Sequence, residues 1–412
     1  MTNPAVVRVN RDRTQGAFLG LDSYQSLVKK ERLSADLYLV MSKHVVFFTN
    51  SAELFLRQQQ HLAEGIKKSG FKVTLICPID STVAQVREAG YACETIYLNR
   101  KSVNPILELW TLVSLIFLLR RLKPDIMQLF TIRPVVYGSL VARLLGVPLI
   151  VNTVSVVMLT PLLRWGLSWI FKNALNHEHI RFVFLNRDDQ ENYISKGWVQ
   201  RGQSQVIPGA GVDTSEFLPP KAEPARPVRI LYAGRFLKDK GLNELVQACD
   251  RLHAEDIPFR LVLCGQWDPS HTNFIGEERM QEILERKFVE NLGFKQNMPA
   301  VYQEVHVVCL PSYREGFPQA LIEAAACGRA LVTTDVPGCR DVVTNGQNGF
   351  LSEVHSVADL HRALRALILD EDLRLRLGRR SREMALAKFD KTRLVEEGLR
   401  VYGEVVEERL AA

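Results

Sequence analysis

Short apolar runs alternate with longer amphipathic segments along most of the chain, and this alternation begins at residue 44. A strand over His44–Asn50 leads into a helix from about Ala52 to Ser69, which Gly70 ends, and a second strand follows over Phe71–Pro78. Short apolar runs between turn signals are typical of buried parallel strands, and the segments between them are long enough for crossover helices. The pattern predicts a β–α–β unit.

The alternation continues and gives two series of strands. Further strands are expected at 93–98, 125–130, 149–153, 181–185 and 205–208, then at 228–233, 259–264, 307–310 and 330–334. Helices are expected at 84–89, 105–122, 135–145, 186–195, 243–255, 280–291, 298–302 and 319–327, and two or three more over 358–408. Strands alternating with helices predict the α/β class with parallel sheets.

The chain is too long for one ordinary core, and prolines at 219, 220, 224 and 227 mark a linker. Residues 1–42 show no clear period and are expected to form an N-terminal extension. We therefore predict one domain over 43–215, a second over 216–388 and a final segment over 389–412.

Positive charge is concentrated in the first half of the chain. The net charge is only +6, but residues 98–202 hold thirteen Lys and Arg against six Asp and Glu. No basic motif with interleaved aromatic residues is present, so nucleic acid is not expected as a partner. An anionic membrane or a pyrophosphate-bearing partner fits this charge better.

The cysteines and the apolar segments bear on the compartment. None of the seven cysteines forms a C-x-x-C pair, and we expect reduced core thiols in a cytosolic protein. The first 43 residues lack the apolar core of a signal peptide. The longest apolar run, Ile106–Leu119, contains Glu108 and is shorter than the roughly 20 residues that a spanning helix needs. No membrane span is predicted.

Two apolar segments could nevertheless lie on a membrane surface. One is Ile106–Leu119, and the other is Met158–Leu175, where Trp165 and Trp169 stand beside Arg164 and Lys172. Apolar helices with basic neighbours are typical of interfacial elements. Ordinary core helices of the first domain are the alternative.

The strongest candidate site is the loop Ser312–Phe317, which follows a predicted buried strand and precedes a small-residue helix. Glu315 lies in this loop, and Glu323 lies in the helix among Ala, Leu, Ile and Cys. A buried carboxylate needs a partner, and either a sugar diol or an arginine could supply it. Pro318 suits the first helical position, where free N–H groups can face an anion.

A second candidate loop is G-R-F-L-K-D-K-G at 234–241. Gly234 leaves room for a ligand, and Arg235 and Lys240 can both reach one anion from a loop before a helix. Gly265 ends the next strand at the same edge. A solvated basic loop is the alternative, and Lys238 is the neighbouring cation that we do not select.

The first domain offers fewer candidates. The turn after the first strand reads Asn50-Ser51, where a dinucleotide-binding turn would carry glycines, which argues against NAD. Arg133 follows a strand at the expected ligand edge, although an exposed arginine on a solvated loop would give the same pattern.

The motifs together resemble one family. The run E-G-F-P-Q-A-L-I-E, followed by C-G-R-A-L-V-T-T-D-V-P-G, resembles the E-x7-E signature of the retaining glycosyltransferases of family 4. The run K-P-D-I-M-Q-L-F-T-I-R-P-V-V-Y-G is similar to the bacterial branch that builds capsule, O-antigen and exopolysaccharide, and G-A-G-V-D-T-S-E-F-L-P-P also resembles the family.

This resemblance implies a GT-B fold, in which two Rossmann-like domains face a cleft and the C-terminal helix crosses back to the first domain. It implies transfer of a sugar, with retention, from a nucleotide donor, with a UDP preference, to an undecaprenyl-diphosphate-linked or polysaccharide acceptor. The enzyme would work at the inner face of the cytoplasmic membrane, attached peripherally. No metal or other cofactor is expected, and the lack of an Asp-x-Asp loop agrees with that.

The resemblance also assigns residue roles. Glu315, Arg235 and Lys240 would be catalytic, and Asn50 and Arg133 would lie on the acceptor side. The donor would be bound by Gly234, Arg235, Lys240, Gly265, Glu315, Gly316, Phe317, Pro318 and Glu323.

The first domain departs from the family pattern at two places. Leu54, Gln58 and Gln59 stand where many members carry an aromatic residue and a His-Arg pair, and Val154–Met158 replaces a Gly-Leu-Gly loop. Two other functions stay open: a sugar-nucleotide epimerase of the same fold, and a non-catalytic partner subunit.

Overall fold

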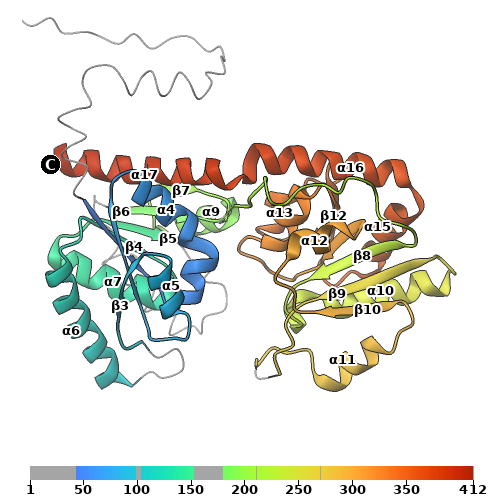
Figure 1. Ribbon diagram of the computed structural model, residues 1–412, viewed down its shortest axis with the longest axis horizontal. Coiled ribbons are helices and arrows are strands. Elements are labelled where there is room, and N and C mark those ends of the chain that lie inside the picture. The colour runs from blue at the N-terminus through green and yellow to red at the C-terminus, as the bar shows by residue number, and fades with distance from the viewer. Residues whose placement is uncertain (1–42, 99–103, 153–179, 210, 270, 412) are drawn as a thin grey trace, which may run out of the picture.

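The protein consists of two α/β domains joined by a pair of long helices (Figure 1). The computed structural model describes residues 43–98, 104–152, 180–209, 211–269 and 271–411. The extension 1–42, the loop Val154–Met158 and the predicted interfacial segment Met158–Leu175 lie outside the described residues.

The first domain is built on seven parallel strands in the order β3-β2-β1-β4-β5-β6-β7. The strands are β1 (His44–Phe48), β2 (Lys72–Cys77), β3 (Ala92–Thr95), β4 (Ile126–Leu129), β5 (Leu149–Asn152), β6 (Ile180–Phe184) and β7 (Ser204–Val206). The helical segments are α3 (Ala52–Leu54), the π-helical turn η1 (Phe55–Gln59), α4 (Gln60–Lys68), α5 (Val83–Glu88), α6 (Pro105–Leu122), α7 (Ile132–Leu145), α9 (Arg187–Ser195) and the 3-10 turn η2 (Arg201–Gln203).

Both faces of this first sheet are buried, which explains why its strands are continuous apolar runs. Side chains alternate along a strand, so Val46 and Phe48 pack with α6, α7 and α9, whereas Val45 and Phe47 pack on the opposite face. The cover of that opposite face comes from α4, α5 and the last helix of the chain.

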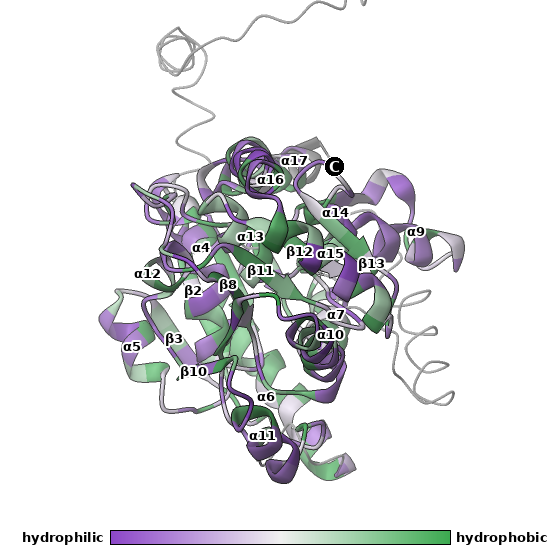
Figure 2. Cartoon of the chain, turned by 90° about the vertical axis from the view of Figure 1, so that its right-hand side faces the viewer, coloured by the Kyte–Doolittle hydropathy of each residue, from purple (hydrophilic) through white to green (hydrophobic). Residues whose placement is uncertain are grey.

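The second domain has six parallel strands in the order β10-β9-β8-β11-β12-β13. The strands are β8 (Val228–Ala233), β9 (Phe259–Cys264), β10 (Val289–Gly293), β11 (Val307–Leu310), β12 (Ala330–Thr334) and β13 (Gly349–Ser352). The helices are η3 (Lys238–Lys240), α10 (Leu242–Ala254), α11 (Glu277–Leu284), α12 (Met298–Gln303), α13 (Gln319–Ala326), α14 (Cys339–Val342) and α15 (Val357–Leu369). Figure 2 shows the hydrophobic strands of this sheet enclosed by helices with hydrophilic outer faces.

The chain ends in α16 (Glu371–Met384), the π-helical turn η4 (Ala385–Phe389) and α17 (Lys391–Ala411). Figure 1 shows these helices running along one side of both domains, with α17 over the first. Leu394, Val401 and Tyr402 of α17 belong to the core of the first domain. The crossing is close: a Cβ on Gly65 of α4 would lie 2.3 Å from Val395, and one on Gly398 would lie 2.7 Å from Leu62.

Two expectations about secondary structure were wrong. The stretch 280–291 is not one helix, because α11 ends at Leu284 and β10 begins at Val289. Arg133 lies in the first turn of α7, not in a loop. The edge strand β13 was not expected from the sequence.

All seven cysteines are free. The sulfur atoms of Cys77 and Cys93, on neighbouring strands, are 3.7 Å apart. Within the described ranges, no helix is both long enough and apolar enough to cross a membrane.

Candidate active site

The two candidate loops of the second domain meet where its strand order reverses. From β8 the chain moves outward to β9 and β10, then returns to β11 on the other side of β8. Open parallel sheets bind ligands at the carboxyl ends of the strands at such a switch point. Arg235 and Lys240 lie in the loop after β8, and Glu315–Pro318 lie in the loop after β11.

Lys240 and Glu315 form an ion pair that joins the two loops. Nζ of Lys240 is 2.5 Å from Oε1 of Glu315, and both side chains are about 85% buried. The hydroxyl of Ser312 donates to the same carboxylate oxygen at 2.8 Å. The two charges that are predicted to act on the donor therefore pair with each other.

Arg235 lies in the same loop as Lys240 and is exposed. Its backbone carbonyl accepts a hydrogen bond from the hydroxyl of Tyr232 at 2.8 Å, which fixes the start of the loop. No residue within the described ranges forms an ion pair with its guanidinium. Arg235 is thus a positive charge open to solvent at the switch point, and Lys238 is exposed as well.

Glycines let the backbone segments of this site approach one another. A Cβ on Gly265 would lie 1.9 Å from the carbonyl oxygen of Gly234, so the ends of β8 and β9 are in direct contact. Gly241 follows Lys240 with a φ of 70°, and a Cβ there would lie 2.0 Å from the carbonyl oxygen of Pro311. Only glycine fits both the left-handed conformation and this contact.

Residues 316–318 join the second domain to the first. Nδ2 of Asn186, at the start of α9, donates to the carbonyl oxygen of Gly316 at 2.9 Å. The ring of Phe317 lies against Gly209 and 5.6 Å from the ring of Phe389. Pro318 is buried and precedes α13 rather than occupying its first position. The carboxyl ends of the first sheet therefore contact the loop that carries Glu315.

Glu323 has a hydroxyl partner, not a cation. Its Oε2 accepts a hydrogen bond from the hydroxyl of Tyr302 at 3.0 Å, and no arginine within the described ranges pairs with it. Burial raises the pKa of Glu323 to about 7, against the opposing hydrogen bonds from Tyr302 and Gln319. The arginine salt bridge considered from the sequence is therefore absent from this part of the chain, and the carboxylate is partly protonated near neutral pH.

The two acceptor-side candidates lie apart. Asn50 lines a hollow of about 610 Å³ at the carboxyl ends of β1, β2 and β3, together with Ser51, Asp80 and Tyr97. Arg133 lines neither this hollow nor the cavity at the domain junction. Its Nη1 lies 3.1 Å from Oε1 of Glu108 on α6, so Arg133 is an ion-paired residue between α6 and α7.

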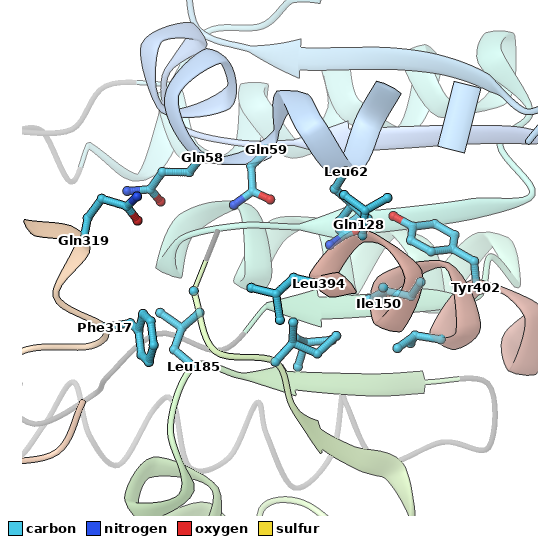
Figure 3. A pocket seen from close by; sticks show the side chains of 16 residues that line it. Gln58, Gln59, Leu62, Gln128, Ile150, Leu185, Phe317, Gln319, Leu394 and Tyr402 are labelled. Atoms are coloured by element: carbon cyan, nitrogen blue, oxygen red, sulfur yellow. The ribbon is translucent and has the colours of Figure 1, made fainter. Parts of the chain in front are cut away.

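The structure also reveals a cavity that the sequence did not indicate. It lies at the domain junction, has a volume of about 120 Å³ and is lined by residues from both domains and α17. Figure 3 shows Gln58 and Gln59 on one side of it and Phe317 and Gln319 on another. In the sequence, only the departure from the family pattern at Gln58 and Gln59 pointed to residues that line this cavity. Nothing in the sequence pointed to the contact of Asn186 with Gly316, because the two residues are 130 positions apart.

No group of three or more His, Cys, Asp or Glu side chains that could hold a metal occurs within the described ranges. Metal independence stays a prediction.

Comparison with known proteins identifies the fold and the family. A family model for "Glycosyl transferase 4-like" proteins matches residues 44–180, and one for "Glycosyl transferases group 1" matches residues 213–384. Among solved structures, a glycosyltransferase from Rickettsia africae superposes with a TM-score of 0.77 at 17% identity, covering 89% of this chain and 99% of its own. An Anabaena protein solved with UDP and glucose superposes with a TM-score of 0.72 at 17% identity, covering 87% of this chain and 99% of its own. At these sequence identities, both structures show the fold alone.

Two curated relatives are similar over most of the chain. An N,N'-diacetylbacillosaminyl-diphospho-undecaprenol alpha-1,3-N-acetylgalactosaminyltransferase of Campylobacter jejuni is 24% identical over 381 residues, covering 87% of this chain and 98% of the relative. A UDP-Gal:alpha-D-GlcNAc-diphosphoundecaprenol alpha-1,3-galactosyltransferase of Escherichia coli is 24% identical over 307 residues, covering 71% and 79%.

Two parallel-sheet domains, with a charged pair at the switch point of the second, define a glycosyltransferase of the GT-B fold. The two family models together match three quarters of the chain, and the chain belongs to the family 4 glycosyltransferases. The predicted GT-B fold and the predicted enzyme class, a hexosyltransferase, are therefore confirmed.

Proposed function

We propose that this enzyme transfers a sugar, with retention, from a UDP-sugar to a glycan acceptor linked to a lipid diphosphate, in the synthesis of a bacterial surface polysaccharide. Donor binding is supported chiefly by the Lys240–Glu315 pair at the switch point of the second sheet, with exposed Arg235 in the same loop as Lys240. Such a site offers cations to a diphosphate and a carboxylate to sugar hydroxyls.

Departure of the nucleoside diphosphate leaves negative charge, which Arg235 and Lys240 stabilise without a metal ion. Glu315 accepts hydrogen bonds from the sugar and orients its anomeric carbon, and Glu323 receives the ribose hydroxyls. The donor diphosphate competes with Glu315 for Lys240, so donor binding frees the carboxylate for the sugar.

The acceptor half is supported by the relatives and by the shape of the first domain. Two relatives are named for acceptors attached to diphospho-undecaprenol. The hollow that contains Asn50 shares Thr95, Ile96 and Tyr97 with a groove along α6, which is lined by Trp110 and Phe117. This surface is polar at one end and apolar at the other, as an amphiphile with a sugar head requires.

The same helix supports contact with a membrane. Ile106, Leu109, Trp110 and Phe117 form what we call the α6 apolar face, and these side chains are between 62% and 77% exposed. The inner side of α6 buries Leu115 and Leu119, so the helix is apolar all round. Surface helices are normally polar outside, and exposed apolar patches mark interaction sites. Arg120 and Lys123 at its end add attraction to anionic lipid.

A donor–acceptor panel tests the proposal. The purified enzyme is mixed with UDP-, GDP- and ADP-sugars and with undecaprenyl- or short-chain alkyl-diphosphate sugars, with and without EDTA. Transfer from a UDP-sugar that survives EDTA is expected. Loss of all transfer in EDTA, restored by manganese, would contradict the metal-free mechanism, and sugar release without any acceptor would favour an epimerase.

The site itself is tested by a matched pair of lysines that lie two positions apart in one turn. Lys240→Ala should lower kcat by about a hundredfold or more, because Lys240 stabilises charge that grows in the transition state. Lys238→Ala removes an equal, exposed charge from the same turn and should leave kcat near that of the wild type. Equal effects of the two substitutions would contradict the assignment.

A further inference from the structure

The loop that carries Glu315 is tied to the loop that carries Lys240 by a residue outside both motifs, Tyr313. Its backbone N–H donates to the carbonyl oxygen of Asp239 at 2.9 Å. Its hydroxyl donates to Oε1 of Glu244, in the first turn of α10, at 2.7 Å. Tyr313 thus makes one bond on each side of Lys240.

A third segment holds the ring of Tyr313 in place. The ring of His355, which follows β13, lies 4.0 Å from it between centroids. Nδ1 of His355 lies 3.4 Å from the same Glu244 oxygen. Glu244 is 14% exposed, and its other oxygen, Oε2, is buried with no hydrogen-bond partner within the described ranges. The carboxylate therefore depends on Tyr313 for its shortest bond.

Tyr313 acts as a donor throughout the working pH range. Burial and the neighbouring Glu244 carboxylate raise the pKa of Tyr313 well above its ordinary value, so the phenol stays protonated. The contact of Gly241 with the carbonyl of Pro311 leaves no space between the two loops. The position of Glu315, two residues after Tyr313, is therefore set by this contact surface.

We propose that Tyr313, held by Glu244, is a positioning residue for glycosyl transfer: it fixes the 312–315 backbone so that Glu315 and Lys240 face the same donor. This inference rests on the proposed function. It adds a residue that acts through Glu315 rather than on the substrate, and it makes the first turn of α10 part of the apparatus that orders the donor loop.

The first test is Tyr313→Phe, which keeps the ring against His355 and removes only the hydroxyl. We expect kcat to fall about tenfold or more, with affinity for free UDP within about threefold of the wild type, because the diphosphate cations remain. Tyr91→Phe is the control, since its hydroxyl makes only a 3.4 Å bond to the carbonyl of Gln60 in the first domain.

The second test asks whether Tyr313 acts through Glu315. The readout is the ratio of the affinities for UDP-sugar and UDP, measured by calorimetry, which isolates the sugar contacts. Tyr313→Phe and Glu315→Gln should each lower this ratio, and the double variant should match Glu315→Gln alone. A further drop in the double variant would overturn the inference.

Variants of the partner complete the set. Glu244→Gln keeps an acceptor oxygen for Tyr313 and should retain most of the wild-type kcat. Glu244→Leu should lower kcat as much as Tyr313→Phe does. The double variant Glu244→Leu/Tyr313→Phe should have the same kcat as either single variant. Wild-type kcat in Tyr313→Phe would overturn the inference and leave the proposed function standing. A wild-type enzyme that transfers no sugar from any donor would instead contradict the proposed function.

Discussion

The two glutamates of the E-x7-E motif lie in different environments: Glu315 is in the loop before α13, and Glu323 is in α13 itself. Glu315 is paired with Lys240, whereas Glu323 is buried beside the hydroxyl of Tyr302 and has a raised pKa. Each environment makes a separate prediction about ligand binding.

Replacing Glu315 should separate nucleotide binding from transfer. In Glu315→Gln, Lys240 no longer has a carboxylate competitor, so affinity for UDP should stay equal or rise by a few fold, while kcat for transfer should fall by about a hundredfold or more. Calorimetry with UDP and a transfer assay measure the two effects. A large loss of UDP affinity would show that Glu315 contacts the nucleotide itself.

Glu323 should release a proton when the nucleotide binds. Ribose hydroxyls that donate to the carboxylate favour its charged form and lower its pKa from about 7, so UDP affinity should rise with pH up to about 7. Calorimetry in buffers of different ionisation enthalpy measures the proton release. Glu323→Gln should abolish it and weaken UDP binding by about 1–3 kcal/mol.

The same pKa has a consequence for stability without ligand. Between pH 4.5 and about 7, the Glu323 carboxyl binds more protons in the folded protein than in the unfolded chain. Its contribution to the free energy of unfolding therefore falls as the pH rises through this range. Glu323→Gln should remove that slope. If the slope persists in the variant, another group is responsible.

At the scale of single elements, α6 makes a prediction about location. Leu109→Glu combined with Phe117→Glu should weaken binding to anionic vesicles about tenfold or more, because apolar burial and charge attraction are both reduced. Co-sedimentation measures it. The matched control is Phe294→Glu with Leu369→Glu, which are 56% and 53% exposed on the second domain. Equal effects, or no binding by the wild type, would contradict a docking role for α6.

Strands that are buried on both faces were predictable from the sequence, because they form continuous apolar runs. The central strands β1, β8, β9, β11 and β12 fall within about a residue or two of the expected ranges, because both their faces are buried and their runs are bounded by turns. The edge strands β10 and β13 were missed because they carry polar or glycine residues and are partly exposed. The π-helical turn η1 was also missed, since its residues have ordinary helical character.

The placement of the two donor-side motifs at one edge of the second sheet was predictable, because each motif follows a buried strand. The resemblance pointed to Glu315 and Lys240, whose donor-binding roles stay predictions, but it did not indicate that they pair with each other. Contacts such as Asn186 to Gly316 or Tyr313 to Glu244 were not predictable, because they join distant segments through ordinary residues. Arg133 was selected as a candidate because it follows a strand, but its guanidinium forms an ion pair with Glu108 on α6.

At the scale of the whole molecule, two glycines allow α17 to lie against α4. Gly65→Ala should destabilise the protein despite the better helix propensity of Ala, because the new Cβ would lie 2.3 Å from the stiff side chain of Val395. Gly403→Ala, on the exposed side of α17 with nothing within 4 Å, should stabilise by up to about 1 kcal/mol. Denaturant unfolding compares them. If both substitutions stabilised the protein, α4 and α17 would not pack as closely as described.

The position of α17 also determines the order in which the two domains can complete their folding during synthesis. One face of the first sheet lacks part of its cover until residues 394–406 are added, and these follow the whole second domain along the chain. At roughly 5–20 residues per second, the second domain emerges and can fold while the first still waits for its closing helix. The first domain is therefore completed only after the second has been synthesised, and the nascent chain exposes part of an apolar sheet face until α17 is added.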